Sequence, residues 1–74
     1  MIFPNKNTVE KVRETYPIGC RVELLEMHDI QAPPIGTKGT VKGVDDAGSI
    51  MVNWDNGGSL SVIYGVDRIC QVET

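Results

Sequence analysis

From Gly19 onward, apolar and polar residues alternate in five short runs that are separated by turn-forming residues. The runs cover residues 20–27, 37–44, 49–54, 59–64 and 68–72. Because the side chains of a strand point alternately to its two faces, a period of two predicts strands that bury one face. Several short strands divided by Gly, Pro, Asn and Asp are typical of a small antiparallel barrel or sandwich. We therefore expect a mainly β fold, with residues 18–74 forming the barrel.

The turn at Asp55-Asn56-Gly57-Gly58 decides which residues of the third and fourth runs face each other. A three-residue loop, 56–58, closed by a left-handed Gly58, pairs apolar residues with one another on a single face. The predicted pairs are Trp54 with Leu60, Val52 with Val62, and Ile50 with Tyr64. A calcium loop would need a third ligand and a later Glu, which this segment lacks. We interpret its Asp and Asn as turn residues that hydrogen-bond their own backbone.

The second and third runs are expected to form a hairpin of the same kind. A four-residue loop, 45–48, gives the opposed pairs Val41 with Val52, Gly43 with Ile50, and Gly39 with Trp54. The last pair places the indole over backbone that carries no side chain. Together the two hairpins predict a three-stranded meander with one apolar face.

Residues 1–17 are expected to form an N-terminal arm and one short helix over residues 7–16. Asn7 is a suitable N-cap, and Glu10 occupies the capping-box position three residues later. Pro17 disfavours a helical conformation at Tyr16, so the helix should end there. An isolated helix this short is marginal, so its apolar stripe must pack on something. The stripe consists of Val9, Val12 and Tyr16, and Ile2 and Phe3 are candidates to join it.

Size and charge restrict the classes of function. The 74 residues allow a single domain, residues 1–74, which leaves little room for a deep substrate pocket beside the core. The formal net charge of −3 argues against binding through nucleic-acid phosphates. No apolar run is long enough for a membrane span or a secretory signal, and the two cysteines form no C-x-x-C motif. We therefore expect a cytoplasmic protein with reduced thiols.

A set of short motifs extends over about two-thirds of the chain. They are G-x-R-V-x-L at 19–24, M-x-D at 27–29, P-x-G-T-x-G-T-V at 34–41, V-D-D-x-G at 44–48 and V-x-W-D-N-G at 52–57. Through these motifs the chain resembles a small uncharacterised family of bacterial and phage or mobile-element proteins, a domain of unknown function. The resemblance implies an SH3-like barrel and no activity. With the helix, the expected fold is a small SH3-like five-stranded antiparallel barrel preceded by one short N-terminal α-helix. The strand pair in residues 36–55 is also similar to the hairpin of KOW-type and chromatin-type modules.

Several side chains invite a chemical interpretation. We interpret Cys20 and Cys70 as small core residues, with a disulfide, or a metal site that includes His28, as alternatives. His28 and Asp29 have the identities of a base and its orienting carboxylate, but adjacent loop residues rarely point at each other. Trp54 is expected in the core, with a partly exposed ligand-binding role as the alternative. We therefore expect no enzyme and no catalytic, metal or cofactor site.

The loop 27–36 is the best candidate for function. It follows the first barrel strand, where SH3 domains carry a ligand-contacting loop, and its proline pair limits the entropy lost on binding. The candidate partner-binding residues are Met27, His28, Asp29, Ile30, Pro33, Pro34 and Ile35. The structural alternative is a loop that folds back to close the end of the barrel.

From these features we expect a non-enzymatic accessory module, a monomer or weak homodimer, that binds another protein through loop 27–36 and has no contact with membranes. The alternative is nucleic-acid binding in a phage or mobile element. It rests on the KOW-type similarity and on a basic helix face formed by Lys6, Lys11 and Arg13. A third possibility is a structural role, in which the apolar helix stripe forms a dimer.

Overall fold

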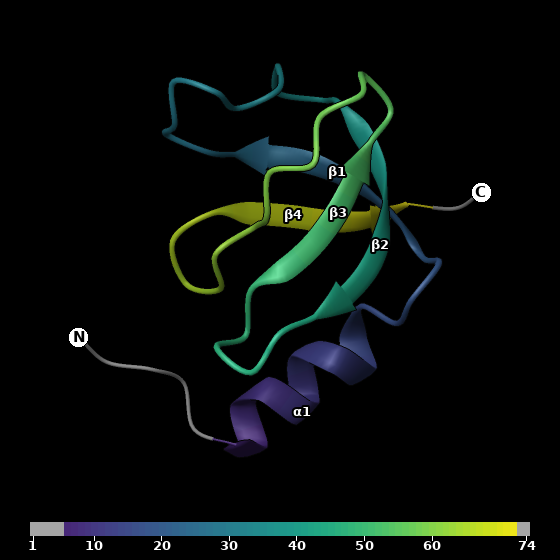
Figure 1. Cartoon of the computed structure of the whole chain (residues 1–74), viewed down its shortest axis with the longest axis vertical. Helices are drawn as coiled ribbons and strands as arrows, with labels where there is room; N and C mark the ends of the chain where they lie inside the picture. Colours follow the sequence, from purple (N-terminus) through teal and green to yellow (C-terminus); the bar gives the residue numbers. More distant parts are fainter. Residues whose placement is uncertain (1–5, 73–74) are drawn as a thin grey trace.

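The computed structural model describes residues 6–72, which form one helix and one antiparallel sheet (Figure 1). The elements are α1 (Lys6–Thr15), β1 (Arg21–Glu26), β2 (Lys38–Val44), β3 (Ile50–Trp54) and β4 (Arg68–Val72). The strands lie in the order β3-β2-β1-β4, so the first and last strands pair with each other. This confirms a mainly β protein with one short helix before the sheet. In the described part of the chain, no helix has the length and apolar character needed to cross a bilayer.

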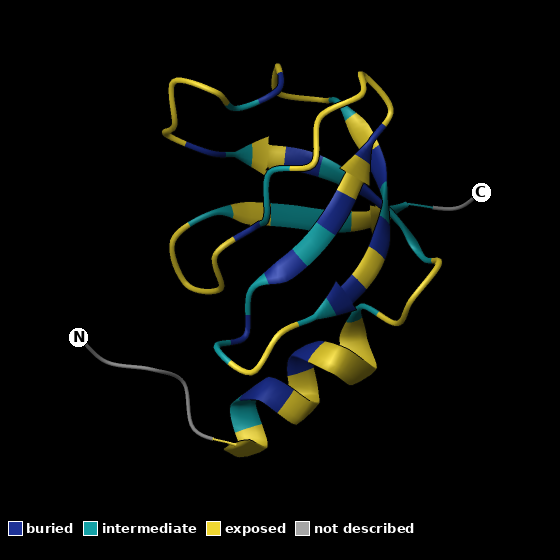
Figure 2. Ribbon diagram, viewed as in Figure 1, coloured by how far each residue is buried: buried dark blue, intermediate teal, exposed yellow. Residues whose placement is uncertain are grey.

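The apolar stripe of α1 packs against the sheet, as its spacing predicts. Val9 and Val12 are buried, and the half-buried Tyr16 packs against the core directly after the helix ends (Figure 2). The helix begins at Lys6, so Asn7 lies inside the first turn and does not cap it. The suggested contribution of residues 2 and 3 to this stripe lies outside the described residues.

The hairpin of β2 and β3 keeps the predicted register only at the end away from its turn. Val41 faces Val52 there, and Gly39 faces Trp54. Near the turn the register shifts by one residue, so that Gly43 faces Met51 and not Ile50. The predicted pairing is therefore wrong for the last part of the hairpin, and a β-bulge between Val41 and Gly43 takes up the difference.

The cause of this shift is the side chain of Asp45. Its Oδ1 accepts hydrogen bonds from the backbone N–H groups of Ala47 and Ser49, both at 2.9 Å. The backbone N–H of Asp45 also donates to the Ser49 carbonyl at 3.0 Å. The loop therefore covers residues 45–49, one more than predicted, and the extra residue is absorbed by the bulge.

The predicted fourth strand, 59–64, is reduced to a single bridge between Ile50 and Val62. The turn before it is a three-residue loop, but it consists of residues 55–57, because the Trp54 N–H donates to the Gly58 carbonyl at 2.9 Å. Gly57, with a φ of 96°, is the left-handed residue, and not Gly58. The register is therefore two residues away from the predicted one. A slip of two keeps every side chain on its face, which is why Val62 is still buried.

The indole of Trp54 explains why this strand does not continue. In a regular antiparallel ladder, Val52 and Leu60 would form the next hydrogen-bonded pair beyond the Ile50–Val62 bridge. The Leu60 carbonyl instead accepts a hydrogen bond from Trp54 Nε1 at 2.8 Å. The segment bends around the indole, and the sheet keeps four strands and stays open.

The core is built mainly from the strands, with Val12 of α1 joining it, and most of its strand residues are ones that the alternation predicts. Its buried members are Val12, Val22, Leu24, Met27, Val41, Ile50, Val52, Trp54 and Val62. Gly39 packs so closely that a Cβ there would lie 2.6 Å from Val52 Cγ1 and 2.9 Å from Trp54 Cε3. This confirms that the indole lies over bare backbone and that Trp54 is a core residue. Tyr64, predicted on the same face, is instead exposed.

Candidate functional site: a groove between two loops

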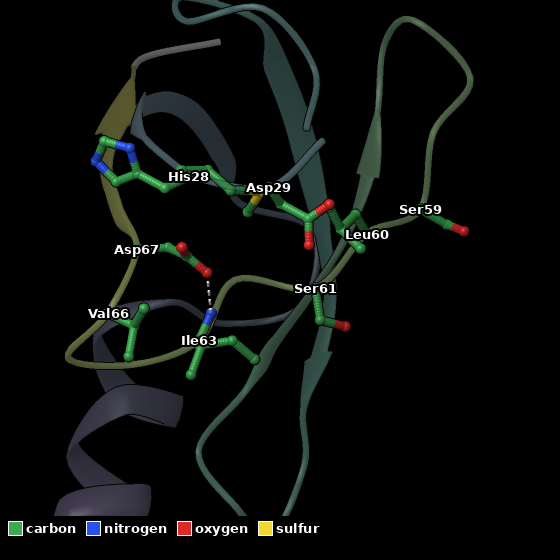
Figure 3. A pocket seen from close by; sticks show the side chains of 9 residues that line it. His28, Asp29, Ser59, Leu60, Ser61, Ile63, Val66 and Asp67 are labelled. Atoms are coloured by element: carbon green, nitrogen blue, oxygen red, sulfur yellow. Dashed lines mark hydrogen bonds between the residues drawn. The ribbon is translucent and has the colours of Figure 1, made fainter. Parts of the chain in front are cut away.

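A groove of about 490 Å³ separates the start of the loop after β1 from the segment that leads into β4 (Figure 3). One wall is residues 27–29, and the other is formed by residues of 59–67. Its lining consists of Met27, His28, Asp29, Ser59, Leu60, Ser61, Ile63, Val66 and Asp67. Two segments that are distant in the sequence therefore build one surface.

The first wall is held in place by the core and by its own turn. Met27 is buried in the core while it lines the groove. Asp29 organises the turn that follows, because its Oδ1 accepts from the Gln31 N–H at 2.8 Å and its carbonyl accepts from the Ala32 N–H at 3.0 Å. The buried Pro33 anchors the far side of the loop. The wall is thus fixed at several points by the fold itself.

The second wall is a compact turn closed by Asp67. Its Oδ2 accepts a hydrogen bond from the Ile63 N–H at 2.9 Å, and its own N–H donates back to the Ile63 carbonyl at 2.9 Å. This turn leaves two apolar side chains in solvent. Val66 is 67% exposed and Ile63 is 45% exposed. The groove therefore has an apolar edge that the fold itself does not cover.

The structure brings together only part of the predicted binding loop. Met27, His28 and Asp29 line the groove, whereas the remaining candidates lie beyond it. Ile30 is 100% exposed, Pro33 is buried, and Pro34 and Ile35 are exposed. The structural alternative predicts a loop that folds back to close the end of the barrel. Among the seven candidate residues, only Met27 and Pro33 are buried as this alternative requires. These findings leave partner binding by the loop as a prediction.

Sequence reasoning missed the second wall. The alternation of residues 59–64 predicts a strand, whose alternate residues would be buried, and it leaves 65–67 as a plain turn. The signal that points to the wall is the run Ile63-Tyr64-Gly65-Val66, in which apolar residues lose the alternation that a half-buried strand requires.

The profile of a protein family described as a domain of unknown function, DUF4314, matches residues 5–72. The chain belongs to this family. No curated protein matches the chain. The family description names no ligand or reaction, so the function of this DUF4314 protein has to be inferred from its own geometry.

The imidazole of His28 is directed away from Ser59 and Ser61 and from the carboxylate of Asp29. Its Nε2 lies 2.9 Å from Glu26 Oε2, and Figure 3 shows the ring and the Asp29 carboxylate pointing in opposite directions. The hydrogen bond from His28 lowers the pKa of the Glu26 carboxyl. Adjacent residues on this loop do not point at each other, as expected, and His28 is not placed to activate Ser59 or Ser61 in this arrangement.

The two cysteines are free thiols, both half-buried. Cys20 immediately precedes Arg21, which faces Val72, whereas Cys70 faces Glu23 on β1. The thiols are thus three positions apart along the strand pair, and the alternation of the strand directs them to opposite faces. The disulfide considered as an alternative is not formed, because both thiols are free in this structure. Within residues 6–72, no group of three His, Cys, Asp or Glu side chains is placed to hold a metal ion.

The carboxylate of Asp55, in the turn after β3, does more than bend the backbone. Arg21 Nη1 donates to Asp55 Oδ1 at 2.8 Å and to the Thr40 hydroxyl at 2.9 Å. This charge-assisted pair lowers the pKa of the Asp55 carboxyl, chiefly through the hydrogen bond. Turn chemistry alone describes Asn56, whose Oδ1 accepts from the Gly58 N–H at 3.0 Å, but it misses the ion pair.

Proposed function

We propose that this DUF4314 chain is a non-enzymatic binding module that engages a segment of another protein in the groove between residues 27–29 and 59–67. The observation that carries the proposal is the apolar edge of the groove, formed by Ile63 and Val66. Exposed apolar residues that adjoin a groove are a common mark of interaction sites. Ile30, which is fully exposed, lies outside the groove and follows the opposite wall in the sequence.

The walls are suited to binding because they are ordered before the partner arrives. The Asp29 and Asp67 turns fix the backbone on both sides, and Met27 ties one wall to the core. Binding to a preformed groove avoids much of the entropy cost of ordering loops. The exposed side chains on these walls can then bury their surface against the partner.

We propose that the open sheet is an SH3-like barrel in which the strand before β4 is nearly lost. We also propose that the protein belongs to a phage or mobile element and functions in the cytoplasm. The pairing of β1 with β4 supports the barrel assignment. In SH3 domains, the loop after the first strand contacts the ligand, and here it forms one wall of the groove. The free thiols are consistent with a reducing compartment.

The two rival functions have less support. Arg13, one of three cations suggested for nucleic-acid binding, is engaged with the Val44 carbonyl and with Asp46 at 3.0 Å. Lys6 and Lys11 remain exposed on α1. The apolar stripe that would form a dimer is packed against the sheet of its own chain. A protein partner in the groove is therefore the proposal that these contacts favour.

A selection experiment tests the proposal while the partner is still unidentified. A random library of 12-residue peptides displayed on phage is selected on the wild-type chain, and enriched peptides are measured against the double variant Ile63→Ser/Val66→Ser. We expect at least tenfold weaker binding to this variant. Ile18→Ser is the matched control, because Ile18 is also an exposed apolar residue (78%) but does not line this groove. Peptides that bind all three proteins equally would place the interface elsewhere and reject the proposal.

A further inference from the structure

Two carboxylates stand on opposite walls of the groove, and each uses one oxygen to close its own turn. Asp29 Oδ1 is occupied by the Gln31 N–H, and Asp67 Oδ2 is occupied by the Ile63 N–H. Among residues 6–72, neither carboxylate forms an ion pair. The second oxygen of each is therefore available to a ligand, in a position that the turn fixes (Figure 3).

Three other acidic side chains among residues 6–72 do have charged or titratable partners. Asp46 pairs with Arg13, Asp55 pairs with Arg21, and Glu26 pairs with His28. Arg68 follows Asp67 in the sequence but faces Glu26 across the β1–β4 pair, and its positive charge contributes to the lowered pKa of Glu26. The cation that neighbours Asp67 in the sequence is thus directed to a different carboxylate, and neither groove aspartate has an ion-pair partner among residues 6–72.

Besides these carboxylates, the groove is lined by the polar side chains of His28, Ser59 and Ser61 and by four apolar ones. Leu60, Ile63 and Val66 line it together with Met27. Such a surface is complementary to a chain segment that offers an apolar side chain and a cation within a few residues of each other. Acidic segments would place like charges against Asp29 and Asp67, which costs binding free energy.

We propose that the groove selects protein segments in which Lys or Arg lies beside an apolar residue, with the apolar side chain against Ile63 and Val66 and the cation between Asp29 and Asp67. This inference rests on the proposed function, and it adds the chemistry of the partner. Arg is favoured over Lys, because its planar guanidinium carries five N–H donors and pairs with carboxylates through two parallel hydrogen bonds. The charge contribution is screened by salt, whereas the apolar contribution is not.

The test uses the same peptide library and a variant that removes charge while it preserves structure. Asp29→Asn/Asp67→Asn retains an oxygen acceptor for each turn. Asp45→Asn is the matched control, since Asp45 also caps its own turn through Oδ1 but lies in the β2–β3 loop. We expect selection on the wild type to enrich Lys or Arg next to apolar residues. The enriched peptides should bind the double Asn variant roughly tenfold more weakly, which is about threefold for each aspartate charge removed. Their affinity for the Asp45→Asn control should equal their affinity for the wild type.

The outcomes separate the two proposals. Groove-dependent peptides without Lys or Arg, or peptides enriched in Asp and Glu, overturn the partner chemistry and leave the binding module standing. The partner chemistry is also overturned if cationic peptides bind the double Asn variant as tightly as the wild type, or if their affinity is equal at 50 mM and 500 mM salt. Peptides that ignore both the Ser and the Asn double variants overturn the groove itself. A doubled mass in sedimentation, lost in the Ser variant, would identify a second copy of the chain as the occupant and overturn the partner chemistry.

Discussion

The two segments that flank β3 show how similar alternation can produce different structures. On one side, β2 pairs with β3 along a continuous ladder that tolerates one bulge. On the other side, residues 58–62 carry an equally regular pattern but make a single bridge at Ile50 and Val62. The difference comes from two contacts. Gly39 lets β2 approach β3 closely, whereas the Trp54 indole takes the Leu60 carbonyl that a ladder would use. Alternation fixes the face of a residue, and local competition for backbone groups fixes whether a strand forms.

The largest expected effect comes from filling the close approach on the paired side. Gly39→Ala places a Cβ within 2.6–2.9 Å of Val52 Cγ1, the Asn53 carbonyl and Trp54 Cε3, so β2 and β3 must separate. We expect a loss of about 3 kcal/mol in the free energy of unfolding, measured by urea denaturation. Gly43→Ala is the control, since its Cβ meets only the flexible end of Met51, at 3.2 Å, and should cost less than about 1 kcal/mol. Equal losses for both variants would contradict the close approach at Gly39.

The second prediction concerns the contact that bends the other segment. Trp54→Phe keeps an aromatic ring but removes the Nε1 donor to Leu60, and we expect a loss of about 2 kcal/mol from the hydrogen bond and the smaller side chain. Amide hydrogen exchange should show weaker protection at Ile50 and Val62 than in the wild type. Tyr64→Phe serves as the control, because Tyr64 is an exposed aromatic of the same segment. Unchanged protection at Val62 would mean that the indole does not hold this segment.

A smaller effect distinguishes the two adjacent glycines of the β3 turn. Gly57 has a φ of 96°, so Gly57→Ala should cost about 1 kcal/mol. In Gly58→Ala the new Cβ meets the Asn56 side chain at 3.3 Å without a left-handed backbone, so we expect a cost close to zero. Thermal unfolding of both variants measures the difference. The reverse order would restore the loop 56–58 that the sequence predicted.

The smallest effect is a pH dependence that belongs to the polar face of the β2–β3 region. Because Arg21 lowers the pKa of Asp55 in the folded state, the pair contributes stability above the unfolded pKa of about 3.9, and this contribution is lost as pH falls through the folded pKa. For Asp55→Asn, the difference in the free energy of unfolding from the wild type should be constant near neutral pH. This difference should shrink as the pH falls below about 4. Arg21→Gln should give the same profile. A difference that persists unchanged to about pH 2.5 would show that the pair is not responsible.

The predictable and unpredictable parts of this molecule differ in their physical origin. The burial of Val41, Val52 and Val62 and the packing of Gly39 follow from a period of two, which survives a register slip of two residues. The exact loops could not be predicted, because the sequence does not show which backbone groups the Asp45 carboxylate and the Trp54 indole will take.

The candidate site was half predictable for a related reason. Loop 27–36 stands out by its composition, and three of its residues line the groove. The opposite wall became visible only when residues 63–67 proved to form a turn closed by Asp67. A groove between distant segments depends on their relative placement, and an alternation pattern contains no information about that placement.

The hydrogen bond between Trp54 and the Leu60 carbonyl has a practical consequence. Trp54 is the single tryptophan of the chain, and Leu60 lines the groove. An occupant that shifts Leu60 changes the polarity sensed by the indole, so its ultraviolet emission reports occupancy without any added dye. Trp54 is thus an intrinsic fluorescent probe of the groove, and a titration in a standard fluorimeter can follow its emission.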